Sequence, residues 1–517
     1  MTEASNNLLA AIDIGASAIR MDVAEATPEG KLRILDSLKK GVQLGKDTFA
    51  SGILSEESIR AACDALRDFK KLMDTYGVIR YRAVATSAVR EAANSDTILD
   101  RILMSTGLDV DVIDGSEENR LTYSAVLESL RGGPDVSRGQ TILVEAGGGS
   151  ADVTMLSDGE LLQSGTFPLG SIRLRAGVGA AAGSHAQRVR LLKAEIAGIV
   201  TTIRRTLPIQ EAVNYVAVGG DVRLAARIAA GENREPGVIV LPRATFVEFV
   251  DSVSKLATDK LVRQYSLSYL DAETLVPSLL TYTQLLKETR AQDVVISGAS
   301  IRLGILLDLI PSAAQARLSN LSHQILSAAR SLGRKYQYDE GHADRVRNLA
   351  ELVFKSLRSE HRLTDTHLLY LQVAAILHDI GLFVGSRSHH KHSQYLISQV
   401  DLFGLRRHEM EIIGNIARYH RRALPQQSHA SFIALDRDDR MIVSKLGAIL
   451  RVANALDKEH SQKLADLTVS IEGDQVVLQT GNLADLTMER LALASRSDFF
   501  AQVFGKRIVL REGSTNP

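Results

Sequence analysis

The sequence contains few residues of several types, and each shortage argues against a class of protein or ligand. Its 517 residues include one cysteine, Cys63, which excludes a disulfide framework and suits a reducing compartment. Tryptophan is absent and aromatic residues make up 5%, which argues against a platform that stacks nucleic-acid bases. Lysine plus arginine equals aspartate plus glutamate at 61 each, so no overall charge attracts nucleic acid or a membrane. An anionic ligand must therefore be held by local groups.

Long hydrophobic runs are also missing. No apolar stretch reaches about 18 residues, the length that a membrane-spanning helix needs, and the first ten residues lack the basic start of a signal peptide. We therefore expect a cytoplasmic protein with no membrane and no nucleic-acid partner. The length predicts about three domains, and a hydrophobic content of 45% is ordinary for globular proteins.

A glycine-rich stretch at residues 142–153, ILVEAGGGSADV, is the centre of the sequence. An apolar run, a glycine turn and a second apolar alternation predict a strand, a turn and a strand. Glycines let backbone N–H groups approach a phosphate, a serine adds a hydroxyl donor, and flanking acids can hold a divalent cation. The turn residues are Gly147, Gly148, Gly149 and Ser150, and the flanking acids are Glu145 and Asp152.

Residues 10–23, AAIDIGASAIRMDV, repeat this plan with Asp13, Gly15 and Ser17. The chain therefore carries the same strand-turn-strand pattern twice. Two such turns that face each other would hold one phosphate from both sides, in a cleft between the halves of a duplicated fold. The alternative is two unrelated hairpins.

A third stretch places a cap and an arginine after a strand. The strand at residues 78–86 is followed by SAVREAAN, so Thr86 and Ser87 lie where a helix begins, a position that favours anions. Arg90 could add a guanidinium to the same anion. The alternative is an ordinary helix cap with a solvated arginine.

Two adjacent acids follow the next strand. The strand at residues 108–113 leads into a helix that we expect Ser116 to cap, with Glu117 and Glu118 in its first turn. Acids in a first turn usually complement the helix dipole. If the glycine turns form a phosphate cleft, however, a glutamate here could take a proton from water that attacks phosphorus.

Strands alternate with helices up to about residue 306, which predicts an α/β architecture, and helices dominate after a boundary near Pro311. A hairpin at residues 467–479 begins a small terminal unit.

The helical region is rich in histidine. A helix that starts after Thr364 ends at His378 and Asp379, His342 lies upstream, and four histidines lie downstream: His389, His390, His392 and His420. Imidazole and carboxylate groups from separate helices can bind a divalent or iron-type metal. The alternative is a structural hydrogen bond at a helix end.

Six ordered motifs together resemble the exopolyphosphatase / guanosine-pentaphosphate phosphohydrolase (Ppx/GppA) family: DIGAS, ATSAVREAAN, DGSEENRL, EAGGGSADV, FPLGSIRL and SGASIRLG. GHADRV, LHDIG, ARYHRR and LRVANALD resemble the HD-like domain of its long members. The resemblance implies the duplicated α/β fold of actin, hexokinase and Hsp70, which is ribonuclease H-like. It implies actin-like domains at residues 1–125 and 126–306, an all-α HD-like domain at 312–462 and a small α+β unit at 463–517.

The resemblance also implies an Mg²⁺-dependent exopolyphosphatase that hydrolyses the terminal phosphoanhydride of inorganic polyphosphate or of guanosine pentaphosphate, in a homodimer. By the same resemblance Glu118 activates water, and Glu145 and Asp152 handle Mg²⁺. Phosphate is held by Asp13, Gly15, Ser17, Thr86, Ser87, Arg90, Gly147, Gly148, Gly149 and Ser150, and an HD-type metal site would comprise His342, His378 and Asp379.

The sequence departs from the family pattern at several positions. Ala16 and Ala18 replace a serine and an asparagine, the two acids beside the glycine turn are exchanged, and Asp221 replaces a threonine. Asn454 replaces the closing aspartate of the HD motif, and an amide is a poor substitute for a charged ligand. A second hypothesis is therefore a sensor that binds polyphosphate or a guanosine alarmone with slow or no turnover, and a third places the chemistry in the HD-like domain.

Overall fold

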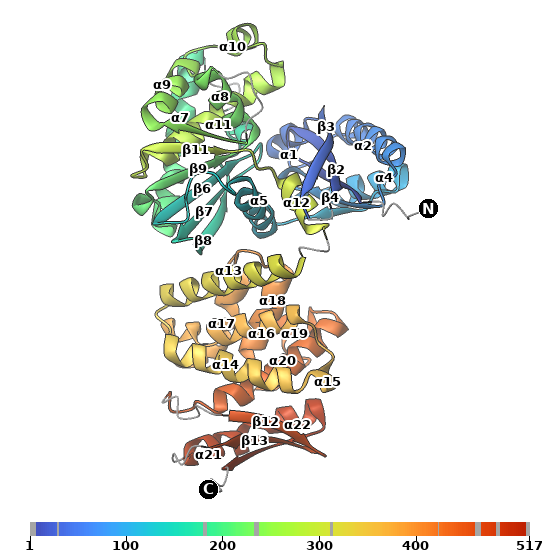
Figure 1. Cartoon of the computed structure of the whole chain (residues 1–517), viewed down its shortest axis with the longest axis vertical. Helices are drawn as coiled ribbons and strands as arrows, with labels where there is room; N and C mark the ends of the chain where they lie inside the picture. The colour runs from blue at the N-terminus through green and yellow to red at the C-terminus, as the bar shows by residue number, and fades with distance from the viewer. Residues whose placement is uncertain are drawn as a thin grey trace. The chain divides into compact units, whose positions relative to one another are not determined.

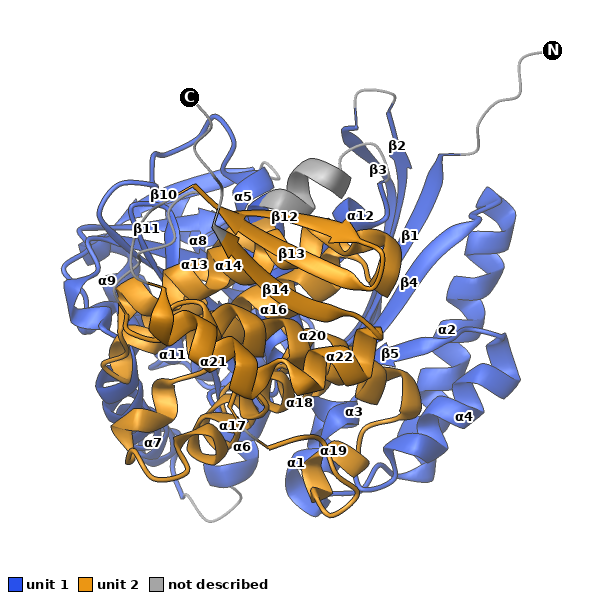
Figure 2. Cartoon of the chain, turned by 90° about the horizontal axis from the view of Figure 1, so that it is seen from below, with its two compact units in different colours: residues 1–320 blue, residues 321–517 orange. Residues whose placement is uncertain are grey.

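The computed structural model describes residues 7–27, 30–178, 183–231, 237–310, 314–421, 423–460, 467–481 and 486–512. It divides into two compact units, Met1–Asn320 and Leu321–Pro517, and the division falls within helix α13 (Ala314–Lys335) (Figure 2). The boundary expected near Pro311 lies outside the described residues, and the finer division into four domains stays a prediction.

The first sheet begins with a hairpin, as the sequence predicts. In it β1 pairs antiparallel with β2, so that Ile14 faces Ile19 across the turn, and β1 pairs parallel with β4. The strand β1 is buried on both faces, which explains its nearly unbroken apolar run. The order is β3-β2-β1-β4-β5, from β1 (Leu8–Ile14), β2 (Ala18–Ala26), β3 (Leu32–Gly41), β4 (Arg80–Ala85) and β5 (Val110–Val112).

The second sheet repeats the first. Its order is β10-β11-β9-β6-β7-β8, and β8-β7-β6-β9-β11 has the same spatial order and strand directions as β3-β2-β1-β4-β5. A duplicated mixed sheet is therefore present, and each copy carries a turn after its first strand. The strands are β6 (Gln140–Ala146), β7 (Ala151–Ser157), β8 (Glu160–Phe167), β9 (Asn214–Val218), β10 (Val238–Pro242) and β11 (Asp293–Ser297).

Helices cover both sheets, and two of them, α5 and α12, pack on each other between the sheets (Figure 1). Gly304 of α12 permits this approach, because a Cβ there would collide with the carbonyl oxygen of Leu121. The helices are α1 (Leu44–Ser51), α2 (Glu56–Tyr76), α3 (Ser87–Arg90), α4 (Ser95–Thr106), α5 (Gly115–Ser129), α6 (Ser171–Val178), α7 (His185–Thr206), α8 (Gly220–Ala230), α9 (Arg243–Val253), α10 (Thr258–Tyr265), α11 (Tyr269–Lys287) and α12 (Ile301–Asp308).

Helices dominate the second unit as expected. They are α14 (Glu340–Ser356), α15 (Arg358–His361), α16 (Asp365–Leu377), α17 (His389–Gln399), α18 (Arg407–Arg418), α19 (Ala430–Ile433) and α20 (Arg437–Ala455). Within the described ranges, only Asp365–Phe383 is long and apolar enough to cross a membrane, and 61% of its apolar window is buried, as in the core helix of a globular unit.

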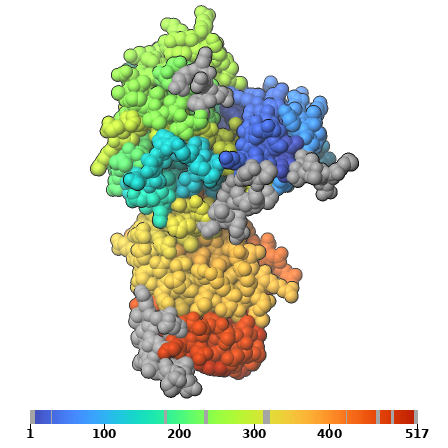
Figure 3. All heavy atoms as spheres, in the orientation of Figure 1, coloured from blue at the N-terminus to red at the C-terminus, as the bar shows by residue number. Residues whose placement is uncertain are grey.

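The predicted C-terminal hairpin is confirmed as β12 (Leu467–Glu472) and β13 (Gln475–Thr480), and β14 (Arg507–Glu512) joins β13 in parallel. Two helices accompany this sheet, α21 (Thr487–Arg496) and α22 (Asp498–Phe504), and both pack on α20 of the same unit. The space-filling view shows this segment in red beside the helical part (Figure 3).

Candidate active site

The two glycine turns of the first unit meet at a cleft of about 710 Å³. A Cβ built on Gly148 would lie 3.0 Å from the Cβ of Ala16 in the opposite turn, and a Cβ on Gly149 would collide with the Ser87 hydroxyl. Glycine at position 148 therefore lets the two turns lie close together, and glycine at position 149 lets the second turn lie against Ser87. Eleven of the predicted residues line the cleft: Asp13, Gly15, Ser17, Thr86, Ser87, Glu118, Glu145, Gly147, Gly148, Gly149 and Ser150.

The backbone of the second turn is oriented by α6. The carbonyl of Gly147 accepts a hydrogen bond from the N–H of Ser171 (3.0 Å), and that of Gly148 accepts one from Ile172 (2.9 Å). The carbonyl of Gly149 accepts one from Arg173 Nε (2.6 Å). In a trans peptide the N–H points away from the C=O, so the N–H groups of residues 148–150 face away from α6. Three such groups in succession form an anion-binding concavity.

The first turn is built in the same way. The carbonyls of Ala16 and Ser17 accept hydrogen bonds from Gly45 (2.9 Å) and Val42 (3.1 Å). The N–H groups of Gly15 and Gly147 donate within their own turns, at 3.1 Å and 2.9 Å. These two glycines therefore shape the turns, and the amides that remain for a ligand are those at the tips.

Glu118 enters the cleft from the first turn of α5. The cap of this helix is Asp114, whose side chain accepts from the N–H of Glu117 at 3.0 Å, so the expectation that Ser116 is the cap was wrong. Ser116 instead donates its hydroxyl to Asp114 at 2.8 Å. The helix thus starts two residues earlier than a Ser116 cap would allow, and Glu118 of its first turn lies in the cleft wall.

Arg90, which was predicted to bind phosphate, contacts Glu118. It does not line the cleft, and its Nη1 donates to Glu118 Oε2 at 2.9 Å and to the carbonyl of Ile113 at 2.5 Å. Burial raises the pKa of Glu118 to about 7; Arg90 lowers it, and the neighbouring carboxylates of Glu145 and Asp13 raise it. Near neutral pH this carboxyl group is therefore poised between its two protonation states.

The adjacent acid Glu117 has a different environment. It accepts hydrogen bonds from Arg120 (2.6 and 2.9 Å) and from Arg82 (2.9 Å). Burial alone would raise the pKa of Glu117, but these guanidinium groups lower it below the usual value. Two neighbours in sequence thus differ: the ionised form of Glu117 is stabilised by two arginines, whereas Glu118 can exchange a proton near neutral pH.

The two predicted Mg²⁺ ligands lie opposite each other across β6 and β7. Glu145 lines the cleft and accepts a hydrogen bond from Thr122, whereas Asp152 is buried, is not among the residues that line the cleft, and accepts one from Thr166 at 2.6 Å. Burial raises the pKa of both, and the nearby carboxyl groups of Asp13 and Glu118 raise the pKa of Glu145 and Asp152, respectively. Acids that repel one another at a cleft wall fit a divalent cation that is shared with a phosphate.

Several cations of the cleft were missed. Arg302 Nε lies 2.8 Å from Asp22, Arg20 lies 3.8 Å from Asp13, and Arg223 donates to the carbonyl of Ala299 at 2.6 Å. Each of these arginines follows a turn residue by two to four positions, in the segments AIRMD, SIRLG and GGDVR. This spacing is the sequence signal from which they could have been predicted. Asp221 also lines the cleft, where burial raises its pKa to about 6.

Tyr282 of α11 was missed as well. Its hydroxyl accepts from the N–H of Ala146 (2.9 Å) and donates to the carbonyl of Val218, which joins the ends of β6 and β9. A Cβ on Gly219 would lie 2.6 Å from this hydroxyl, so glycine is needed there.

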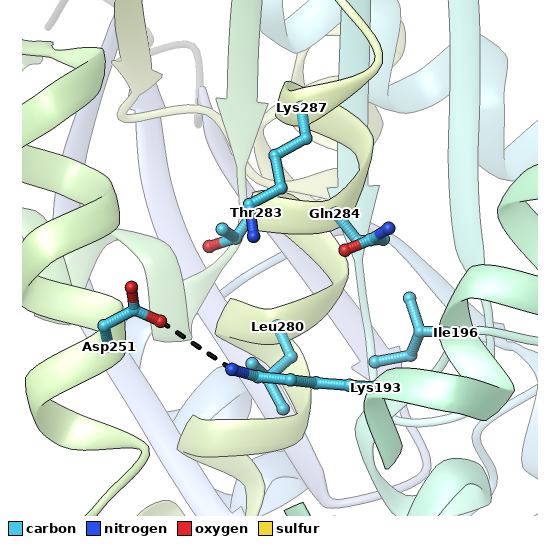
Figure 4. A pocket seen from close by; sticks show the side chains of 7 residues that line it. All are labelled: Lys193, Ile196, Asp251, Leu280, Thr283, Gln284 and Lys287. Carbon is cyan, nitrogen blue, oxygen red and sulfur yellow. Dashed lines mark ion pairs between the residues drawn. The ribbon is translucent and has the colours of Figure 1, made fainter. Parts of the chain in front are cut away.

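A second hollow, between α7, α9 and α11, is not a ligand site (Figure 4). It measures about 10 Å³, and Lys193 pairs with Asp251 across it at 3.7 Å. This is room for about one water molecule.

The histidine-rich part of the second unit also comes together. Ligand atoms of His342, His378 and Asp379 lie within 4.8 Å of one another, and so do those of Asp379, His389 and His420.

The first unit combines a duplicated mixed sheet, a glycine turn whose N–H groups can bind an anion, and a buried carboxyl group with a pKa near 7. These features together indicate an α/β enzyme that acts on phosphate groups. The profile of the Ppx/GppA phosphatase family matches residues 23–313, and that of Ppx/GppA phosphatase domain III matches residues 326–495. The chain belongs to the Ppx/GppA phosphatase family, and the prediction of a hydrolase is confirmed with it.

Named relatives share most of the chain's length. A guanosine-5'-triphosphate,3'-diphosphate pyrophosphatase of Vibrio vulnificus is 25% identical over 495 residues, which cover 92% of this chain and 93% of the relative. An exopolyphosphatase from Cytophaga hutchinsonii has a similar fold (TM-score 0.55, 20% identity) over 59% of this chain and 98% of its own. The Aquifex aeolicus family member covers the same shares with a TM-score of 0.50 and 23% identity.

Proposed function

We propose that the chain is an exopolyphosphatase that hydrolyses the terminal phosphoanhydride bond of inorganic polyphosphate, with Glu118 as general base. The observation that carries this proposal is the position of Glu118: a buried carboxyl group with a pKa of about 7 in the wall of a cleft that the glycine turn, residues 147–150, also lines. A base with this pKa can accept a proton at neutral pH and pass it on after the reaction.

In the proposed reaction the terminal phosphate accepts hydrogen bonds from the N–H groups of residues 148–150 and from the hydroxyl of Ser17. Glu118 takes a proton from a water molecule while the oxygen of that water forms a bond to the terminal phosphorus. At the same time the bond from that phosphorus to the bridging oxygen breaks. The products are orthophosphate and a polyphosphate shorter by one unit. Arg90 holds Glu118 in place and favours its ionised form.

We further propose that Glu145 and Asp13, which line the cleft, hold Mg²⁺ together with phosphate oxygens, and that the buried Asp152, which pairs with Glu145 across β6 and β7, adds negative charge beside them. Mg²⁺ commonly binds one or two carboxylates plus substrate phosphates, and it would neutralise phosphate charge during hydrolysis. Five cations in the cleft lining add positive charge for further phosphates of the chain: Arg20, Lys39, Arg223, Arg227 and Arg302.

Guanosine pentaphosphate is the second candidate substrate. It ends in a triphosphate with the same terminal bond, and the curated relatives across this chain's length carry the name of its pyrophosphatase. We also propose that the protein is a cytoplasmic homodimer, which light scattering would test by a mass of twice 56.2 kDa.

Phosphate release from long-chain polyphosphate and from guanosine pentaphosphate, with Mg²⁺, tests the proposal. Glu118→Gln should lower the rate by about 100-fold or more, the usual contribution of a general base. Glu128→Gln, on the same helix but outside the cleft, is the matched control and should keep the wild-type rate.

If the chain binds polyphosphate tightly but Glu118→Gln releases phosphate as slowly as the wild type, the sensor hypothesis is favoured instead. The third hypothesis is tested by Asp379→Ala: unchanged release would remove the helical unit from this reaction.

A further inference from the structure

A threonine of α5 contacts one of the acids beside the glycine turn. Thr122 is 1% exposed, and its hydroxyl donates a hydrogen bond to Oε2 of Glu145 near the end of β6. An ionised carboxylate can only accept hydrogen bonds, so the hydroxyl is the donor. Thr122 itself does not line the cleft. It can therefore affect the reaction only through Glu145.

This hydrogen bond is the one polar contact that fixes the carboxylate. Among the described residues, Thr122 is the sole hydrogen-bond partner of the Glu145 side chain. A glutamate side chain has several rotatable bonds, and a carboxylate without a partner would sample several positions at the wall of the cleft. The bond to Oε2 restricts this freedom and leaves Oε1 for a cation.

The donor is itself held in place by its neighbours in the chain. A Cβ on Gly304 of α12 would lie 2.2 Å from the carbonyl oxygen of Leu121, the residue before Thr122. Arg120 donates to Asp308 of α12 at 3.3 Å. The backbone around Thr122 therefore cannot shift without disturbing the packing of α5 on α12.

The same helix carries the candidate base. Glu118 and Thr122 are four residues apart, so they lie on one face of α5, one turn from each other. The helix thus sets the position of Glu118 directly and that of Glu145 through one hydrogen bond. A shared support keeps the base and the candidate ligand at a constant separation, which matters because Mg²⁺ demands nearly ideal octahedral geometry at about 2.0–2.1 Å.

The second acid beside the turn has a different supporting threonine. Thr166 donates to Oδ1 of Asp152 at 2.6 Å, but Asp152 does not line the cleft. Of the two threonines, only Thr122 supports an acid that faces the cleft.

We propose that Thr122 is a positioning residue for Mg²⁺, which holds Glu145 in the orientation that binds the ion. The inference rests on the proposed function, because it takes Glu145 as a ligand of the ion that is used in hydrolysis. Its test does not require turnover, since Mg²⁺ binding can be measured without substrate.

Calorimetric titration of the full chain with Mg²⁺ tests the proposal. Thr122→Val keeps the shape of the side chain and removes the hydroxyl, so it should raise the Kd for Mg²⁺ by about 10- to 100-fold, the usual cost of losing an outer partner of a metal ligand. Thr122→Ser keeps the hydroxyl and should restore most of the affinity. The matched control is Thr154→Val, because this threonine is also buried but donates to Asn119 of α5 at 3.4 Å rather than to a carboxylate.

Kinetics and a double variant separate positioning from general damage. A raised Mg²⁺ concentration should restore kcat in Thr122→Val, because the defect lies in binding the ion. In a Glu145→Gln background Thr122→Val should cause no further loss of Mg²⁺ affinity, since both changes act on the same contact. An unchanged Kd in Thr122→Val, an equal rise in Thr154→Val, or a wild-type chain that binds no Mg²⁺ would overturn the proposal, and circular dichroism checks that each variant is folded.

Failure of this proposal and failure of the proposed function give different results. If Mg²⁺ binding depends on Thr122 but phosphate release does not depend on Glu118, the hydrolase assignment fails and the positioning role stands. If release depends on Glu118 but Thr122→Val binds Mg²⁺ as the wild type does, the positioning role fails alone.

Discussion

Substitution of Arg90 tests how the candidate base is controlled. Its guanidinium lies 2.9 Å from Glu118, whose pKa of about 7 is the net result of burial, which raises it, and of Arg90, which lowers it. An opposite charge at such a distance lowers the pKa of a carboxyl group by about 1–3 units, and since Arg90 keeps some contact with solvent we take about 1–2. Arg90→Gln should therefore move the pKa of Glu118 to about 8–9.

The consequence for rate can be worked out. At pH 7 about half of the wild-type Glu118 is ionised, compared with about one-tenth to one-hundredth in Arg90→Gln, so hydrolysis should slow by about 5- to 50-fold. The rate should recover as the pH approaches about 9. Arg90→Lys, which keeps the charge, should retain most of the activity at pH 7.

The assay is the pH profile of kcat/KM for polyphosphate at constant ionic strength, with Arg60→Gln as the control because that arginine lies on the exposed face of α2. A profile with an unshifted midpoint and a raised KM would refute this reasoning. It would show that Arg90 binds phosphate directly, as the motif alone suggested.

Three further outcomes follow from the same contacts. Glu118 keeps its proton in the folded chain between about pH 4.5 and 7, where the unfolded chain has lost it, so unfolding free energy falls as the pH rises through this window. Glu118→Gln should therefore be more stable than wild type by about 1–3 kcal/mol at pH 8 and equal to it at pH 4 in urea melts. Gly149→Ala should lower kcat/KM by at least about 10-fold, because the added methyl group collides with Ser87. In the control Gly198→Ala the methyl group meets no atom within 4 Å, so the free energy of unfolding should rise by about 0.5–1 kcal/mol. Mg²⁺ at 100 times its Kd should add about 2.7 kcal/mol to stability in thermal melts, and Glu145→Gln should abolish most of this gain; an equal response in both chains would exclude Glu145 as a ligand.

The two hairpins that border the cleft could be predicted from the sequence alone. Alternating apolar residues around a carboxylate and a glycine turn are a local signal, because the period of a strand and the needs of a tight turn are set within a few residues. The repetition of that signal was enough to predict the duplicated sheet and the meeting of the turns. Its place after a strand that ends at the same edge suggested that one of the two adjacent acids could face the cleft, and the choice of Glu118 came from the resemblance to the family.

What could not be predicted depends on contacts between distant segments. The partner of Arg90 is decided by how the end of α3 approaches α5, and nothing near Arg90 in sequence encodes it. The helix cap at Asp114 was missed because Asp114 and Ser116 are both good caps only two residues apart. Likewise, the choice of His389 over His390 is set by the face of α17 that is buried.

The second glycine turn has a further consequence, because its peptide groups connect two partners. Their N–H groups face the candidate phosphate site, and their carbonyls accept from Ser171, Ile172 and Arg173 at the start of α6. An anion at the front would polarise each peptide and strengthen the hydrogen bond at its back. Slower deuterium uptake by the amides of Ser171 and Ile172 would therefore report occupancy of the turn, even in a variant that cannot hydrolyse its substrate.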